Sequence, residues 1–175
     1  MEKKIIKIAI TGPESTGKSL LAQQLAEHYR TTWVPEYARS YIDSLSRPYH
    51  QQDLLSIAQG QIRTEEECHK KAGAFLFCDT ELIVVKIWSE VKYHACDEWI
   101  LKMISEHRYD LFLLCDIDLP WEYDPQREHP DKRDYLFKLY KKELEMRDFP
   151  YFVISGIGKS RLNNAIGSID KFFHR

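Results

Sequence analysis

The sequence predicts one α/β domain, spanning residues 1–175, in which a mainly parallel sheet of five strands is covered by helices on both faces. Short apolar runs alternate along the chain with longer stretches of helical periodicity. Uninterrupted apolar runs such as 74–78 are typical of strands buried inside a parallel sheet. The chain length suits a single core, and strands that alternate with helices favour right-handed crossovers.

The first strand, expected within 5–10, leads into the segment 12–19, which reads GPESTGKS. This segment matches the phosphate-binding pattern G-x-x-x-x-G-K-[ST], and the good helix formers of 20–30 follow it. Its two glycines allow the backbone to curl, so that N–H groups face an anion at a helix N-terminus. The segment therefore predicts the loop of a P-loop NTPase.

This loop defines the expected nucleotide site. Lys18 can reach the β- and γ-phosphates of ATP, and the hydroxyl of Ser19 can bind Mg²⁺. The residues expected to bind the nucleotide are Gly12, Glu14, Ser15, Thr16, Gly17, Lys18, Ser19, Leu20 and, from a later segment, Arg127.

The second strand, 31–34, is stopped by Pro35, and Glu36 follows directly. In open α/β sheets this edge faces the ligand crevice, which makes Glu36 and Arg39 candidate site residues. The alternative is that they form an i,i+3 ion pair at the start of a helix. Both readings remain open on spacing alone.

The third strand, 74–78, follows a long helix expected over 51–71 and ends in Asp79-Thr80. An apolar strand that ends in Asp after a phosphate-binding loop is the Walker-B arrangement. We therefore expect Asp79 to lie beside the Mg²⁺ that Ser19 binds.

The segment 119–133 contains three prolines and many charges, so it cannot form a regular element. Long irregular loops in compact domains are usually functional, and we interpret this one as a lid over the site. Its Arg127 and Arg133 could offset charge on a transferred phosphoryl group; the alternative is that they are solvated surface charges. The remaining elements expected are helices at 81–93, 96–107, 134–146 and from 159 onward, and strands at 110–116 and 151–154.

The composition also limits the kinds of partner and the cellular compartment that we expect for the protein. The formal net charge of -2 does not indicate a nucleic-acid surface, and no apolar run is long enough to span a bilayer. The N-terminus shows no signal-peptide pattern, and the four cysteines form no C-x-x-C pair. We expect a reduced, cytoplasmic protein whose partners are small molecules.

Four stretches together resemble the ribosylnicotinamide kinase domain of the NadR proteins and the related NadR-like P-loop ATPases. They are GPESTGKS at 12–19, VPEYAR at 34–39, FCDTE at 77–81 and LPWEYDPQR at 119–127. The resemblance implies a nucleoside-monophosphate-kinase-like fold and Mg·ATP-dependent phosphorylation of the 5′-hydroxyl of nicotinamide riboside, which gives nicotinamide mononucleotide in NAD salvage. NadR proteins carry an adenylyltransferase domain before the kinase, and we expect no such activity here.

The resemblance also implies roles at the acceptor side. Glu36 is the candidate for accepting the 5′-hydroxyl proton, whereas Asp79 is an alternative base that we assign to Mg²⁺ and the ribose. Lys18, Mg²⁺ and Arg127 would stabilise the transition state. Aromatic faces attract the cationic nicotinamide ring, and Asp124 could bind ribose hydroxyls or balance the charge of the ring. Tyr37 and Trp121 would stack on the ring, whereas Trp88 is expected in the core. The full set of expected acceptor-site residues is Glu36, Tyr37, Arg39, Asp79, Trp121 and Asp124.

Two other functions compete with this one. The same scaffold could phosphorylate another nucleoside or deoxynucleoside, or the chain could be a regulatory P-loop ATPase without a small-molecule acceptor. Asp79 is followed by Thr80 and not by the Glu that activates water in many motor ATPases, and the sequence has no N-K-x-D guanine-reading motif. Both features favour a kinase.

Overall fold

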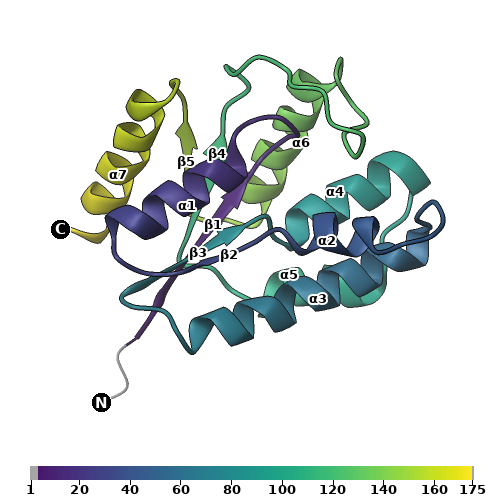
Figure 1. The fold of residues 1–175 in the computed structure, drawn as a ribbon, viewed down its shortest axis with the longest axis horizontal. Coiled ribbons are helices and arrows are strands. Elements are labelled where there is room, and N and C mark those ends of the chain that lie inside the picture. The colour runs from purple at the N-terminus through teal and green to yellow at the C-terminus, as the bar shows by residue number, and fades with distance from the viewer. Residues whose placement is uncertain (1–3, 175) are drawn as a thin grey trace.

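The computed structural model describes residues 4–174, and within them five parallel strands form one sheet of order β2-β3-β1-β4-β5 (Figure 1). The predicted five-stranded α/β fold is therefore confirmed. The strands are β1 (Ile6–Thr11), β2 (Trp33–Val34), β3 (Phe75–Asp79), β4 (Leu111–Cys115) and β5 (Tyr151–Ile154). The helices are α1 (Lys18–His28), α2 (Tyr37–Asp43), α3 (Gln51–His69), α4 (Leu82–Tyr93), α5 (Glu98–Glu106), α6 (Arg133–Met146) and α7 (Lys159–Phe173).

The alternation of side chains along β1 divides the core into two layers. Ile8 and Ile10 point to one face, where they pack with residues of α1 and α7. Ala9 points to the other face, where α3, α4, α5 and α6 supply most of the buried side chains. Figure 1 shows the same division, with α1 and α7 on one side of the sheet. The central strands β3 and β4 are buried on both faces because helices cover both faces of the sheet.

The register of the sheet brings the ends of three strands together. Ile10 of β1 pairs with Asp79 of β3, and Thr11 pairs with Leu114 of β4. Since the strands are parallel, the polar residues that follow each of them emerge at the same edge. The phosphate-binding loop, Glu36, Asp79 and the segment 119–132 all begin at that edge.

Local capping explains where helix α5 starts. Helix α5 begins at Glu98, two residues later than predicted, because the Asp97 side chain accepts a hydrogen bond from Trp99 N at 2.8 Å. The segment Tyr37–Asp43 forms the short helix α2, and Glu36, for which the sequence left two readings open, stands at its N-cap. None of the described helices is long and apolar enough to cross a membrane.

Arg161 ties α7 to the phosphate-binding loop and is only 4% exposed. Its Nη2 donates to the carbonyl oxygens of Thr16 at 2.7 Å and Asp116 at 3.0 Å, and its Nη1 donates to Asp118 at 2.7 Å. One side chain therefore joins the loop after β1 to the segment that follows β4.

Replacement of Arg161 by Met is expected to lower the free energy of unfolding by about 3 kcal/mol, because it leaves buried carbonyl groups without a donor. Chemical denaturation monitored by circular dichroism measures the change. The matched control is Arg63→Met on the exposed face of α3, which should cost less than about 0.5 kcal/mol. Equal losses in the two variants would contradict a structural role for Arg161.

Candidate active site

The loop between β1 and α1 adopts the curl that its glycines allow. Gly12 and Gly17 have φ angles of 134° and 75°, which side chains disfavour. A Cβ atom on Gly12 would also lie 3.0 Å from the Cys115 carbonyl oxygen. Lys18 begins α1, and its Nζ donates to the carbonyl oxygens of Gly12 at 3.0 Å and Pro13 at 2.7 Å. The ammonium group therefore lies over the loop, beside the place where phosphates would bind.

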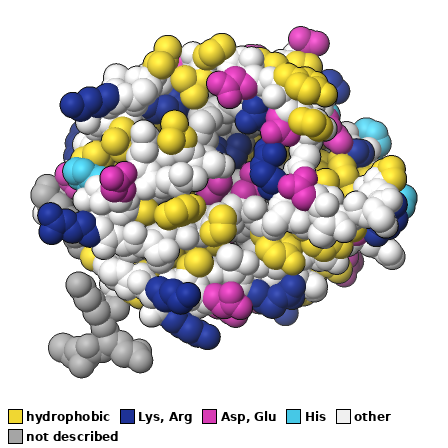
Figure 2. Space-filling model, viewed as in Figure 1, with side chains coloured by type: hydrophobic (Ala, Val, Ile, Leu, Met, Phe, Trp, Pro, Cys, Tyr) yellow, Lys and Arg dark blue, Asp and Glu magenta, His cyan; other side chains and the backbone are white. Residues whose placement is uncertain are grey.

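A cavity of about 520 Å³ opens beside this loop, and Figure 2 shows this face of the molecule hollowed, with acidic and basic side chains gathered around the hollow. The loop 12–20 forms one end of the cavity. Apolar side chains of α4 and α6 form a chamber beyond it, made of Val84, Ile87, Trp88, Val91, Leu136 and Tyr140. Helix α2, the segment 119–132 and the turn before α7 complete the wall with Glu36, Ala38, Arg39, Ile42, Leu119, Pro120, Glu122, Gln126, Arg127, His129 and Ile157.

Asp79 lies behind the loop and contacts Ser19. The Ser19 hydroxyl donates to Asp79 Oδ2 at 2.5 Å. Burial raises the pKa of Asp79 above its ordinary value, while the hydrogen bond from Ser19 and the charge of Lys18 oppose that shift. A hydroxyl and a carboxylate fit Mg²⁺, which prefers one or two protein oxygens together with phosphate oxygens and waters. Residues 4–174 contain no cluster of three or more His, Cys, Asp or Glu side chains that could hold a metal without a ligand.

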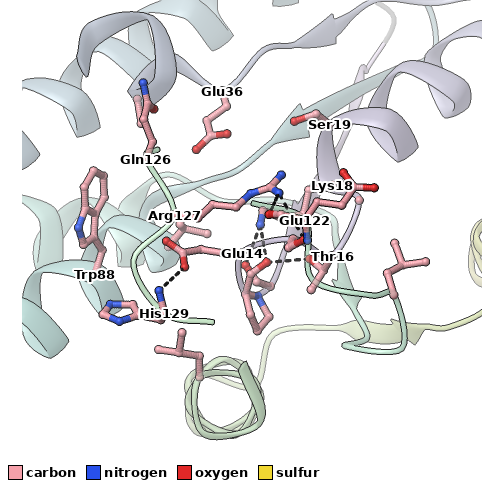
Figure 3. A pocket seen from close by; sticks show the side chains of 18 of the residues that line it. Glu14, Thr16, Lys18, Ser19, Glu36, Trp88, Glu122, Gln126, Arg127 and His129 are labelled. Carbon is pink, nitrogen blue, oxygen red and sulfur yellow. Dashed lines mark hydrogen bonds between the residues drawn. The ribbon is translucent and has the colours of Figure 1, made fainter. Parts of the chain in front are cut away.

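Glu36 faces the cavity across from Arg127 (Figure 3). It stands at the N-cap of α2, yet its side chain makes no capping bond to this helix among the described residues. Burial raises the pKa of Glu36 above its ordinary value, and Lys18 is the strongest of the positive charges that oppose the shift. The alternative reading, an i,i+3 ion pair between Glu36 and Arg39, does not describe the ion pair of Arg39, which is formed with Asp124 at 2.9 Å. A carboxylate with a raised pKa in a cavity is a candidate general base.

The segment 119–132 lies on the phosphate-binding loop and, as expected, contains no helix or strand. The Glu14 carboxylate accepts hydrogen bonds from the backbone N–H group of Glu128 at 3.1 Å. It also accepts one from the backbone N–H group of His129 at 3.0 Å, which Figure 3 shows. Ser15 accepts from Arg127 Nη1 at 3.3 Å through its hydroxyl and from Arg133 Nη1 at 3.1 Å through its carbonyl. The segment, for which we keep the name lid from the sequence interpretation, therefore lies on residues of the loop itself.

The cavity lining lacks four of the expected acceptor-site residues, namely Tyr37, Asp79, Trp121 and Asp124. The Tyr37 ring packs on Gly60 of α3, where an added Cβ atom would lie 2.0 Å from the ring. The ring of Trp121 lies 5.8 Å from the Arg133 guanidinium, and Asp124 is engaged by Arg39. The aromatic residues in the lining are instead Trp88 and Tyr140.

Sequence reasoning did not place Trp88 and Tyr140 in the site. Both belong to the apolar faces of helices that pack on the core, and the same periodicity describes a buried residue and a cavity wall. The available signal was position, since α4 follows directly from the Asp79 strand end.

The first strand of the parallel sheet leads into a glycine-rich loop that carries Lys18 and Ser19, and Asp79 ends the neighbouring strand β3. This arrangement defines a P-loop nucleotide-binding protein. The chain matches the family AAA_28, described as AAA domain, over residues 7–161, and it belongs to this family.

The resemblance to NadR proteins that the four motifs indicated is confirmed. The chain is 32% identical over 127 residues to the trifunctional NAD biosynthesis/regulator protein NadR of Escherichia coli K12. The match covers 69% of this chain and 30% of that protein, so the chain spans less than a third of this relative.

Solved structures give the same fold. A crystal structure of NadR with NR has a TM-score of 0.79 at 18% identity, covering 96% of this chain and 50% of that one. A second, with NAD and AMP-PNP, has a TM-score of 0.74 at 19% identity, covering 96% and 49%. Deoxyadenosine kinase from M. mycoides has a TM-score of 0.64 at 14% identity, covering 95% of this chain and all of that one (100%). The fold is thus shared with NadR and with a nucleoside kinase.

Proposed function

We propose that this chain is an ATP-dependent phosphotransferase that converts nicotinamide riboside into nicotinamide mononucleotide. One observation carries the proposal: the phosphate-binding loop and the Glu36 carboxylate open onto a single cavity that continues into an apolar, partly aromatic chamber. An ATPase that uses water as its acceptor needs no such chamber. The likeness to NadR, one of whose structures contains NR, supports the choice of acceptor.

On the nucleotide side, the backbone N–H groups of the loop and Lys18 would hold the phosphates of ATP. Ser19 and Asp79 would hold Mg²⁺, which neutralises charge on the β- and γ-phosphate oxygens when bound. Leu20 and Ile157 are exposed and line the cavity beside the loop, where they offer apolar surface to the nucleotide.

On the acceptor side, Glu36 would accept the proton of the 5′-hydroxyl while the oxygen attacks the γ-phosphorus. The bond between the γ-phosphorus and the bridging oxygen then breaks, and ADP leaves. Arg127 lines the cavity beside Ser15 and would stabilise charge on the transferred group.

The aromatic residues that we assign to the nicotinamide ring differ from those expected from the sequence. We assign stacking on the cationic nicotinamide ring to Trp88, with Tyr140 beside it in the same chamber, because both line the cavity. The ion pair between Arg39 and Asp124 lies at the edge of this region, where it joins α2 to the lid.

A coupled ADP-release assay with Mg·ATP tests the proposal. Nicotinamide riboside is compared with adenosine, uridine, thymidine and deoxycytidine, and products are identified by mass. Preferential formation of nicotinamide mononucleotide is the expected result. Preference for another nucleoside would assign the chain to the broader class of nucleoside kinases. ADP release that no acceptor stimulates would reject the kinase assignment.

A further inference from the structure

A polar network outside the phosphate site links three distant segments of the chain. Its centre is the hydroxyl of Tyr49, in the connection between α2 and α3. This hydroxyl donates to Glu128 Oε1 of the lid at 2.6 Å. It accepts from Trp88 Nε1 at 2.9 Å and from Lys92 Nζ, both on α4. We refer to Tyr49, Trp88, Lys92 and Glu128 as the Tyr49 network.

The chemistry of the network is complementary. A tyrosine hydroxyl has one donor and two acceptor positions, and within the described part of the chain all of these positions are used. Burial raises the pKa of Tyr49 to about 12, so the hydroxyl keeps the proton that it donates. Burial opposes ionisation of Glu128, yet the hydrogen bonds from Lys92 and Tyr49 hold its pKa below the ordinary value. Lys92 Nζ also pairs directly with Glu128 at 2.8 Å.

Glu128 has a second set of contacts through its backbone. Its N–H group and that of His129 donate to the carboxylate of Glu14 in the phosphate-binding loop. The same residue therefore touches the loop through its main chain and α4 through its side chain. Trp88, the far member of the network, lines the apolar chamber of the cavity.

The indole of Trp88 is fixed by these contacts. Its ring meets the Tyr49 ring edge-on at a centroid distance of 5.0 Å, and its N–H group is held by the Tyr49 hydroxyl. With both contacts in place, the ring keeps one orientation toward the cavity.

From this juxtaposition we infer that Tyr49 and Glu128 are positioning residues for the phosphate acceptor. They set the orientation of Trp88, and the acceptor chamber is complete only when the lid is seated on Glu14. The inference rests on the proposed kinase function and deepens it. It predicts that a nucleotide bound at the loop prepares the chamber on the far side of the cavity for the acceptor.

Kinetics of Tyr49→Phe and Glu128→Gln test the inference. Tyr49→Phe should raise the KM for nicotinamide riboside about tenfold, because it removes the hydrogen bonds of the Tyr49 hydroxyl. It should leave the KM for ATP within about twofold of the wild-type value. Glu128→Gln should act in the same direction, and the double variant should be less than additive because both changes break one network. Glu128 lies in the irregular lid, so its substitution does not disturb the core.

The chain offers a matched control in Tyr151, whose hydroxyl donates to Glu145 at 2.9 Å on an exposed surface away from the cavity. Tyr151→Phe should leave both KM values unchanged. A Tyr49→Phe variant that behaves like Tyr151→Phe, or that raises the KM for ATP as much as that for the acceptor, would overturn the inference.

A binding readout separates failure of this inference from failure of the proposed function. If the wild-type chain phosphorylates no nucleoside in the panel, Mg·AMP-PNP is titrated. The emission of Trp88 is obtained for the wild type and for each variant as the difference from the same chain carrying Trp88→Phe. The nucleotide should change this emission in the wild type and in Tyr151→Phe, and much less in Tyr49→Phe. An equal change in Tyr49→Phe would show that Trp88 does not depend on the network.

Discussion

Replacing Lys18 by Ala is expected to lower kcat for phosphoryl transfer about 1000-fold, because it removes a fixed positive charge from the developing transition state. Phosphoryl transfer relies on positioning and charge stabilisation, so little else in the site can compensate. Lys18 Nζ lies over the loop through its bonds to the Gly12 and Pro13 carbonyl oxygens, which places the charge before ATP binds. Steady-state kinetics at saturating Mg·ATP measure the loss.

The chain contains its own control for this experiment. The run 156–160 reads GIGKS and looks superficially like a second phosphate loop, but it lacks the first glycine at the required distance. Lys159 in this run is exposed and lies outside the cavity lining. Lys159→Ala should change kcat less than about twofold, as is usual for a surface substitution. A comparable loss in the two variants would place the phosphates elsewhere.

Replacing Glu36 by Gln is expected to lower kcat about 100-fold or more, the usual range for removal of a general base. The affinity for ATP should change little, because Glu36 faces the cavity and does not belong to the loop. Isothermal titration with Mg·AMP-PNP gives the affinity, and initial rates give kcat. An unchanged kcat would reject Glu36 as the base.

The pH profile adds an independent test of Glu36. Only the ionised carboxylate can accept a proton, so activity should fall as the pH drops through the pKa of Glu36. Burial raises that pKa above the ordinary glutamate value, and the acid limb should therefore lie at higher pH than for an exposed carboxylate. The limb should disappear in Glu36→Gln.

Asp79→Asn distinguishes the two carboxylates of the site. Burial also raises the pKa of Asp79, so a pH profile alone does not separate them. Because Asp79 holds Ser19 and would hold Mg²⁺, its amide variant should raise the Mg²⁺ concentration required for half-maximal rate. Persistence of the acid limb in Glu36→Gln, with its loss in Asp79→Asn, would reverse the two roles.

The strands, the loop and most helix boundaries were predictable from the sequence because their causes are local. The apolar run of β3 and its terminal Asp79 lie within a few residues of each other, and the glycines of the loop 12–17 determine its curl wherever it folds. The class of nucleotide-binding fold and the phosphate end of the cavity followed from these features.

The proposed acceptor end of the cavity was decided by tertiary structure. Tyr37 follows Glu36 in the chain, yet its ring packs on Gly60 of α3, which leaves room for it, and not in the cavity. Trp88 belongs to the apolar face of α4, and only the packing of α2, α4 and α6 leaves a chamber beside it. Helical periodicity identifies the face that is turned inward, but it does not reveal whether that face meets another side chain or an open cavity.

The contacts of the lid depend even more on the folded state. Glu128 lies 114 residues from Glu14 and 79 from Tyr49, and it meets both only when the strand ends converge at one edge of the sheet. Sequence alone therefore determined the fold and the chemistry of the phosphate loop, since local spacing encodes both. Which side chains line the proposed acceptor chamber, and how the segment 119–132 reaches them, was decided by long-range packing that no local pattern contains.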